Sequence, residues 1–212
     1  IPRERATAAE SALIADWVAA NHGDTLIALG LGGYEVGFPP ERFADAFARA
    51  ARKGVPAVIH AGETEGPDSI WGAIRSLGAQ RIGHGVRALE DPSLLEYLRK
   101  NGIPLEVCIS SNVCLGVASD YSAHPLARLI EHGLTVTLNT DDPPMFATNL
   151  AREFEIAMDT FGFGPEIIVD ALETAWNHSL ASPAIRQSLW SRLERPLELL
   201  RRTTTEKSLG RQ

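Results

Sequence analysis

Short apolar runs alternate with longer amphipathic segments along most of the chain. The runs begin 31, 24, 24 and 30 residues apart, a spacing typical of repeated strand–helix units. They occupy residues 25–30, 56–60, 80–84, 104–109 and 134–139. The pattern therefore predicts five strands, joined by connections long enough for parallel pairing.

The segments between these strands repeat apolar residues at helical spacing. They cover residues 40–53, 67–77, 91–101 and 124–132. Gly54, Gly78, Gly102 and Gly133 follow them and mark helix ends. Asp91-Pro92 supplies an N-cap followed by proline at the first helical position. Helix, glycine and strand thus recur four times, which predicts an α/β fold.

The chain is helical before the first strand and after the last one. A helix is expected over residues 9–20, and further helices over 147–161, 165–179 and 182–202. The polar residues 203–212 are expected to form a flexible tail. Since no linker or low-complexity segment interrupts the pattern, residues 1–212 are interpreted as one domain.

Five strands are compatible with two architectures. An open doubly wound sheet is complete with five strands, and strand count alone favours it. A (β/α)8 barrel needs eight strands, so this chain would then form only part of one. The glycines at 30–33 lead into a Pro-Pro turn and lack the spacing of a phosphate-binding loop, which argues against a nucleotide cradle there.

Composition excludes several classes of protein. The 212 residues include 20 basic and 27 acidic side chains, giving a net charge of −7, and 44% are hydrophobic. Such a chain is globular rather than disordered, and its acidity argues against a nucleic-acid partner. No apolar run approaches the ~20 residues of a membrane span, so no membrane partner is expected. Cys108 and Cys114 form no disulfide framework, which favours a cytoplasmic location.

Polar side chains collect where the predicted strands end. His60 and Glu63 follow one strand, His84 ends the next, and Asp141-Asp142 follows the last. Because carboxyl ends of parallel strands share one face, these groups can converge. Singly, each has a structural explanation: a buried or turn histidine, or a capping acid. Two adjacent carboxylates after a buried strand are costly without a cation or donor, so the set favours a functional site.

The remaining candidates are weaker. The cysteine spacing lacks a CxxC pair, which excludes a zinc finger and the cytidine-deaminase type of zinc site. No serine lies in GxSxG, so an α/β-hydrolase is excluded. Surface positions are expected for His22, His124 and His132, and local packing for His178, Trp71 and Trp176.

An ordered set of short motifs resembles the adenosine deaminase family over roughly residues 24–180. The motifs are Gly-Leu-Gly-Gly-Tyr-Glu at 30–35, His-Ala-Gly-Glu at 60–63, Arg-Ile-Gly-His-Gly at 81–85, Leu-Glu-Val-Cys at 105–108, Ser-Asn at 111–112, His-Pro-Leu at 124–126 and Asn-Thr-Asp-Asp-Pro at 139–143. Each motif alone is modest evidence for the family, but the order and spacing of the whole set are very specific for it.

The resemblance implies a (β/α)8 barrel with one Zn²⁺, in which this chain forms strands 4 to 8 and extra C-terminal helices. It also implies a zinc-dependent aminohydrolase that removes the 6-amino group of an adenine-type nucleoside or base and releases ammonia. The small-molecule purine would be its partner.

By position, the resemblance also assigns residue roles. His60 and Asp141 resemble metal ligands. Glu63 resembles the acid that protonates purine N1, and His84 the residue that orients or deprotonates the metal-bound water. The backbone of Gly33 would contact N3, and Asp142 would form a hydrogen bond with the purine edge at N7.

Some positions depart from the family pattern. The sequence contains no His-x-His pair, which the family carries on its first strand. We therefore expect an N-terminal segment to supply those ligands, and weak or no zinc binding by this chain alone. Tyr34 and Gly30 also differ from the residues common in the family, and in this they resemble the branch that includes aminodeoxyfutalosine and adenine deaminases. Neither the adenine-type substrate nor the oligomeric state follows from the sequence.

Two alternatives stay open at this point. One is a metal-dependent hydrolase of another substrate on a similar barrel, sharing His60 and Asp141 but not the purine contacts. The other is an inactive fragment that lacks the N-terminal metal ligands.

Overall fold

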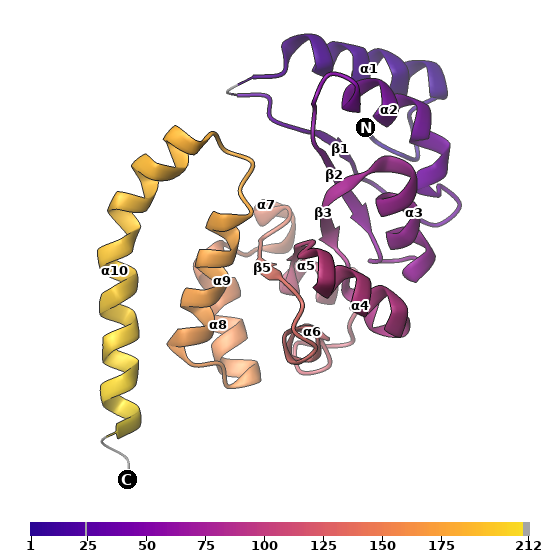
Figure 1. Ribbon diagram of the computed structural model, residues 1–212. Helices are drawn as coiled ribbons and strands as arrows, with labels where there is room; N and C mark the ends of the chain where they lie inside the picture. The colour runs from indigo at the N-terminus through magenta and orange to yellow at the C-terminus, as the bar shows by residue number, and fades with distance from the viewer. Residues whose placement is uncertain (24, 210–212) are drawn as a thin grey trace. The chain divides into compact units, whose positions relative to one another are not determined.

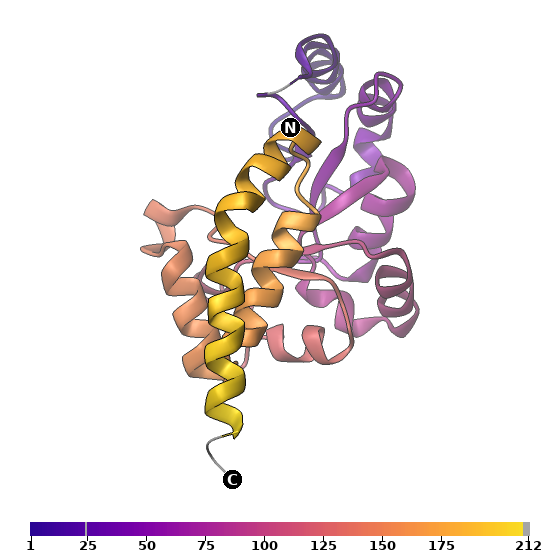
Figure 2. The same ribbon diagram turned by 60° about the vertical axis from the view of Figure 1, so that its left-hand side comes forward.

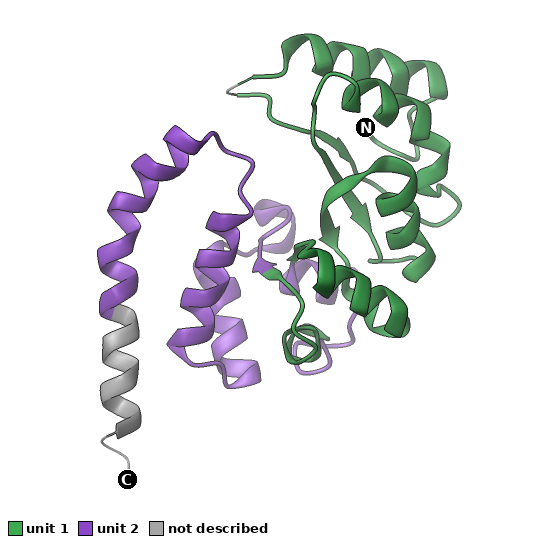
Figure 3. Cartoon of the chain, in the orientation of Figure 1, with its two compact units in different colours: residues 1–107, 125–136 green, residues 108–124, 137–212 purple. Residues whose placement is uncertain are grey.

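The computed structural model describes the backbone of residues 1–23 and 25–209, and the side chains of residues 1–23 and 25–199. The chain divides into two compact units, coloured separately in Figure 3. Unit 1 comprises Ile1–Val107 and Pro125–Val136, and unit 2 comprises Cys108–His124 and Thr137–Gln212. The interpretation of residues 1–212 as one partial barrel domain stays a prediction.

The strands follow one another in the sheet in chain order, β1-β2-β3-β4-β5. Figure 1 shows the first three of them, β1 to β3, side by side. β1 to β4 pair in parallel. A doubly wound sheet reverses its strand order at a switch point, whereas a barrel adds strands in sequence. The predicted α/β class is therefore confirmed, and the open doubly wound alternative is wrong. The strands are β1 (Leu29–Leu31), β2 (Ala57–Ala61), β3 (Ala79–His84), β4 (Leu105–Val107) and β5 (Val136–Leu138).

Helices cover one face of the sheet in unit 1. Helix α3 packs on β2 and β3, and α1 packs on α2. Along β2, Ile59 is buried and His60 is partly exposed, as expected when successive side chains point to opposite faces. The helical elements of unit 1 are α1 (Ala8–Asn21), η1 (Pro40–Phe43), α2 (Ala44–Ala51), α3 (Pro67–Leu77), η2 (Val86–Glu90), α4 (Pro92–Asn101) and α6 (Leu126–Glu131).

Unit 2 is mainly helical. Helices α9 and α10 lie side by side (Figure 2), with the rings of Trp176 and Trp190 centred 5.7 Å apart. α10 includes residues 203–209, which the sequence assigns to a tail, and residues 210–212 of that tail lie outside the described residues. The helices of unit 2 are α5 (Ile109–Cys114), α7 (Pro143–Phe146), α8 (Leu150–Phe161), α9 (Pro165–Asn177) and α10 (Pro183–Leu209).

Three strands differ from the sequence prediction in extent, and the third of them, β5, covers only Val136–Leu138 of the predicted residues 134–139. β1 begins only at Leu29, whose N–H donates to the Pro56 carbonyl at 2.9 Å, so pairing with β2 sets where it starts. β4 ends at Val107, and the residues from Ile109 turn into α5, a helix that the apolar pattern does not predict. Within the described part of the chain, no helix is both long and apolar enough to cross a membrane.

Asp91 caps α4, as the Asp-Pro pair predicts. Its carboxylate accepts hydrogen bonds from the Ser93 and Leu94 amides at 2.8 and 3.3 Å. The indole N–H of Trp71 on α3 also donates to it, at 2.9 Å. These bonds, the Trp71 bond foremost, lower the pKa of Asp91 from 3.8 to about 2. The carboxylate thus caps one helix and ties it to its neighbour.

Replacing Asp91 with Asn should destabilise the protein in a pH-dependent way. Because the folded-state pKa lies below the unfolded one, the charge contributes its stability above pH 3.8 and loses it as the pH falls toward 2. The difference in free energy of unfolding between wild type and D91N, from urea titrations, should therefore shrink over this interval. D159N, at an exposed position on α8, is the control. A D91N difference that does not change with pH would contradict the role of the charge.

Candidate active site

His60 lies on the partly exposed face of β2. With Gly30, Gly32 and Val58 it lines a cavity of about 420 Å³ in unit 1. A Cβ atom at Gly83, its neighbour on β3, would lie 2.8 Å from His60 Cδ2, and one at Gly32 would lie 3.7 Å from Cε1. The glycines therefore leave the space that the imidazole ring occupies.

His84 ends β3 in a backbone conformation that is rare for residues with a side chain. Its φ is +64°, in the left-handed region, which costs on the order of 1–2 kcal/mol for a non-glycine residue. The ring is 2% exposed and its centroid lies 4.9 Å from that of His60, edge to face. The strained turn thus places two imidazoles together at the carboxyl ends of β2 and β3.

Glu63 faces His84 across the same strand ends. Its Oε1 lies 3.4 Å from His84 Nδ1, and its side chain is only 12% exposed. The chain reaches this position through Gly62, which has φ +71° and where a Cβ atom would overlap the side chain of Ile70. A glycine is required at this turn, as the Ala-Gly pair between His60 and Glu63 suggests.

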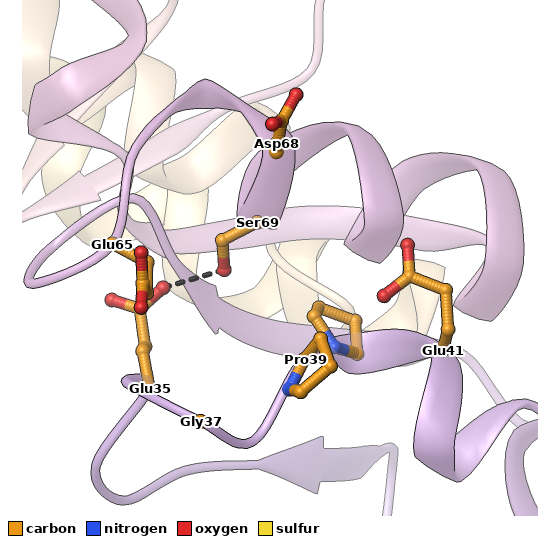
Figure 4. A pocket seen from close by; sticks show the side chains of 8 residues that line it. Glu35, Gly37, Pro39, Glu41, Glu65, Asp68 and Ser69 are labelled. Carbon is orange, nitrogen blue, oxygen red and sulfur yellow. Dashed lines mark hydrogen bonds between the residues drawn. The ribbon is translucent and has the colours of Figure 1, made fainter.

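Glu35 is a buried acid to which the sequence analysis assigns no role. Its carboxylate accepts from the amides of Gly62 (2.9 Å), Glu63 (2.8 Å) and Thr64 (3.0 Å), and from the Ser69 hydroxyl (2.5 Å; Figure 4). Burial acts to raise the pKa of Glu35, but the hydrogen bonds from Ser69 and the amides outweigh it and lower the pKa. Glu35 is therefore ionised at neutral pH. In the sequence, the signal that Glu35 has a role was its position inside the motif at 30–35.

Arg3 is a second buried charge in unit 1. Its guanidinium donates to the carbonyl oxygens of Phe38, at 3.3 Å, and His60. Burial lowers the pKa of Arg3, while the charges of Glu35 and Glu4 raise it in part. Arg3 therefore fixes the backbone of His60, while Glu35 holds the loop after it.

Gly33 lines the same cavity as His60. Its φ is +96°, and a Cβ atom there would overlap the Glu4 carboxylate. The structure therefore brings four predicted site residues together in unit 1. They are Gly33, His60, Glu63 and His84.

The two predicted aspartates belong to unit 2. Asp141 has φ +55° and accepts a hydrogen bond of 2.7 Å from the buried Ser111 hydroxyl on α5. Asp142 is exposed and stands at the N-cap of α7, but its side chain makes no capping hydrogen bond. Helix capping therefore does not explain the second carboxylate.

Glu153 on α8 is a fully buried acid that the sequence analysis does not single out. Its carboxylate accepts from the Ser110 amide at 3.1 Å and the Thr148 hydroxyl at 2.5 Å. The Ser110 amide lies in the first turn of α5, where a carboxylate is favoured by the helix dipole. Glu153 thus anchors the helix that carries Ser111.

His124, expected at the surface, is buried. Its Nε2 lies 3.0 Å from Asn112 Oδ1, and burial lowers its pKa to about 4. The imidazole is therefore neutral at pH 7. The surface prediction is wrong because a loop position in the sequence does not reveal which side chain folds back onto α5.

Comparison with known proteins identifies the family. A family model described as adenosine deaminase matches residues 3–196. An adenosine deaminase of Serratia proteamaculans is 41% identical over 168 residues, covering 79% of this chain and 51% of the relative. One from Yersinia enterocolitica is 42% identical with the same coverage. The chain spans about half the length of these curated relatives.

Solved structures share the fold. Adenine deaminase from Arthrobacter aurescens is 29% identical and superposes with a TM-score of 0.85, covering 92% of this chain and 59% of that one. An amidohydrolase from Burkholderia ambifaria with bound Zn gives 0.87 at 23% identity, covering 97% and 57%, which supports the fold alone. With the sequential parallel strands, these TIM-barrel neighbours confirm the predicted barrel class. The chain belongs to the adenosine deaminase family.

Proposed function

We propose that the protein hydrolyses the 6-amino group of an adenine-type nucleoside or base and releases ammonia. The observation that carries this proposal is the pair formed by His84 and Glu63, 3.4 Å apart and shielded from solvent, beside His60 at one end of the sheet. An imidazole and a carboxyl group in such surroundings can move protons to and from a reacting molecule. Family membership and the adenine deaminase of Arthrobacter aurescens support the purine as substrate.

The donor groups suit a zinc ion. We propose His60 and Asp141 as its ligands, since imidazole nitrogen and carboxylate oxygen are typical zinc donors. The hydrogen bond from Ser111 to Asp141 is of the kind that orients a ligating carboxylate. Catalytic zinc sites have three protein ligands, so a further ligand is needed. Zn²⁺ would supply Lewis acidity, which makes water acidic enough to react near neutral pH.

The residues of unit 1 then have separate tasks. His84 accepts a proton from the water that adds to C6 of the purine. Glu63, in its protonated form, donates a proton to N1, so that negative charge does not accumulate on the ring. His84 then returns its proton to the amino nitrogen as the C6–N6 bond breaks and ammonia leaves, and the proton of the C6 hydroxyl passes to the Glu63 carboxylate, which leaves a carbonyl at C6 and restores both side chains. The backbone of Gly33 would lie along the N3 edge, and Asp142 would contact N7.

The substrate class is tested with the native gene product that contains these 212 residues, purified with Zn²⁺. We expect at least one of adenosine, adenine and aminodeoxyfutalosine to lose its adenine absorbance, with one ammonia released per purine consumed. Turnover of none of the three, in protein that contains zinc, would contradict the proposed substrate class and favour a metal-dependent hydrolase of another kind.

The proton-transfer roles are tested by Glu63→Gln and His84→Ala. Each should lower kcat by at least about 100-fold, because loss of a general acid or base commonly costs that much. Zinc content, measured by mass spectrometry of the metal, should stay nearly unchanged because neither residue is proposed as a ligand. Glu65→Gln, two residues further along and lining a separate acidic pocket, is the matched control. A fully active Glu63→Gln enzyme would show that Glu63 is not the acid.

A further inference from the structure

Three successive amides in unit 1 point at one carboxylate. The N–H groups of Gly62, Glu63 and Thr64 all donate to Glu35, at 2.9, 2.8 and 3.0 Å. Successive amides around a residue with positive φ form an anion-binding concavity, and Gly62 supplies that conformation. The loop at 62–64 is therefore shaped around the Glu35 side chain.

Glu35 also connects this loop to the helix that follows it. Its Oε2 accepts from the Ser69 hydroxyl, in the first turn of α3, as well as from the Gly62 amide. Figure 4 shows the Glu35–Ser69 bond at the wall of a pocket of about 310 Å³. The carboxylate is 2% exposed, so water cannot replace these donors without local opening.

The hydrogen bond from the Glu63 amide to Glu35 holds the backbone of the residue whose side chain faces His84. Glu35 binds the backbone of Glu63, while the Glu63 carboxylate lies 3.4 Å from His84 Nδ1. A shift of the backbone at Glu63 moves its carboxylate by a similar amount. Displacements of about 1 Å can cost 100-fold in rate when they misplace a reacting group.

We propose that Glu35 is a positioning residue, which holds the 62–64 loop so that the Glu63 carboxyl group meets the purine and His84. This inference rests on the proposed role of Glu63. Glu35 itself touches the backbone of the loop and not the reacting atoms. The carboxylate charge is essential to the arrangement, because four donors converge on its two oxygen atoms. A side-chain amide in place of the carboxylate would direct its NH2 group at one or more of these donors.

The test compares Glu35→Gln with Glu41→Gln in the native gene product that contains these 212 residues, loaded with Zn²⁺. Glu41 lines the same pocket as Glu35 but is exposed, which makes it a matched carboxylate-to-amide control. Glu35→Gln should lower kcat by about tenfold or more, with KM and zinc content little changed, because the loop is displaced rather than the binding site removed. Glu41→Gln should behave as wild type.

Hydrogen exchange provides a readout that does not depend on turnover. In Glu35→Gln the amides of residues 62–64 should exchange about tenfold faster or more, while amides of α4 keep their wild-type rates. If purines are not deaminated but this local acceleration occurs, the proposed function fails and the anchoring by Glu35 stands. Unchanged exchange at residues 62–64, or equal kcat in Glu35→Gln and Glu41→Gln in an active enzyme, would overturn the proposal.

A second variant covers the case in which Glu35→Gln does not fold. Ser69→Ala removes one of the four donors and keeps the carboxylate. It should give a smaller acceleration of exchange at residues 62–64 and a smaller loss of kcat in the same direction. A folded Ser69→Ala protein with wild-type exchange and kcat would count against the proposal.

Discussion

The turn after β2 depends on the hydrogen bonds that the buried, ionised carboxylate of Glu35 accepts in unit 1. A buried charge is costly unless donors replace its water, and here three amides and a hydroxyl do so. Satisfying that charge fixes the turn after β2 and joins it to the first turn of α3. The nearby charge of Arg3 adds Coulombic attraction and is hydrogen-bonded to the carbonyl of His60. One pair of buried charges therefore holds the backbone around both His60 and Glu63.

Backbone strain occurs at predicted site residues in each of the two units. Among the described residues, left-handed φ values without glycine occur at His84, Asp141 and Ala147, two of which are predicted site residues. Such conformations persist only where the surroundings determine them. His84 is held against His60 and Glu63, and Asp141 is held by Ser111. Favourable packing elsewhere in each unit offsets the conformational free energy that the left-handed backbone costs at these positions.

The repeating pattern of the sequence predicts most elements of the fold, because periodicity and glycine stops are local signals. Helix α3 is found over the predicted residues 67–77, and Asp91 caps α4 as expected. The extents of β1, β4 and β5 were predicted less well, since pairing with a neighbouring strand decides where a strand begins and ends. Helices α5 and α7 are too short to carry a helical period of their own.

The candidate site was predictable only in part, for a similar reason. Residues directly after apolar runs could be expected at one edge of the sheet, and His60, Glu63 and His84 are found together. Glu35, Arg3 and Glu153 interact with residues distant in sequence, so no local pattern reveals that they are buried. His124 looked like a loop residue for the same reason, although it is packed on Asn112.

We propose that the residues at the strand ends serve a hydrolytic deamination in which water replaces the amino group at C6. Isotope incorporation tests it most directly. When the native gene product that contains these residues acts on an adenine-type substrate in water enriched in ¹⁸O, we expect a product that carries the heavy oxygen at C6, with equimolar ammonia. A product that forms without ¹⁸O at C6, or without release of ammonia, would contradict it.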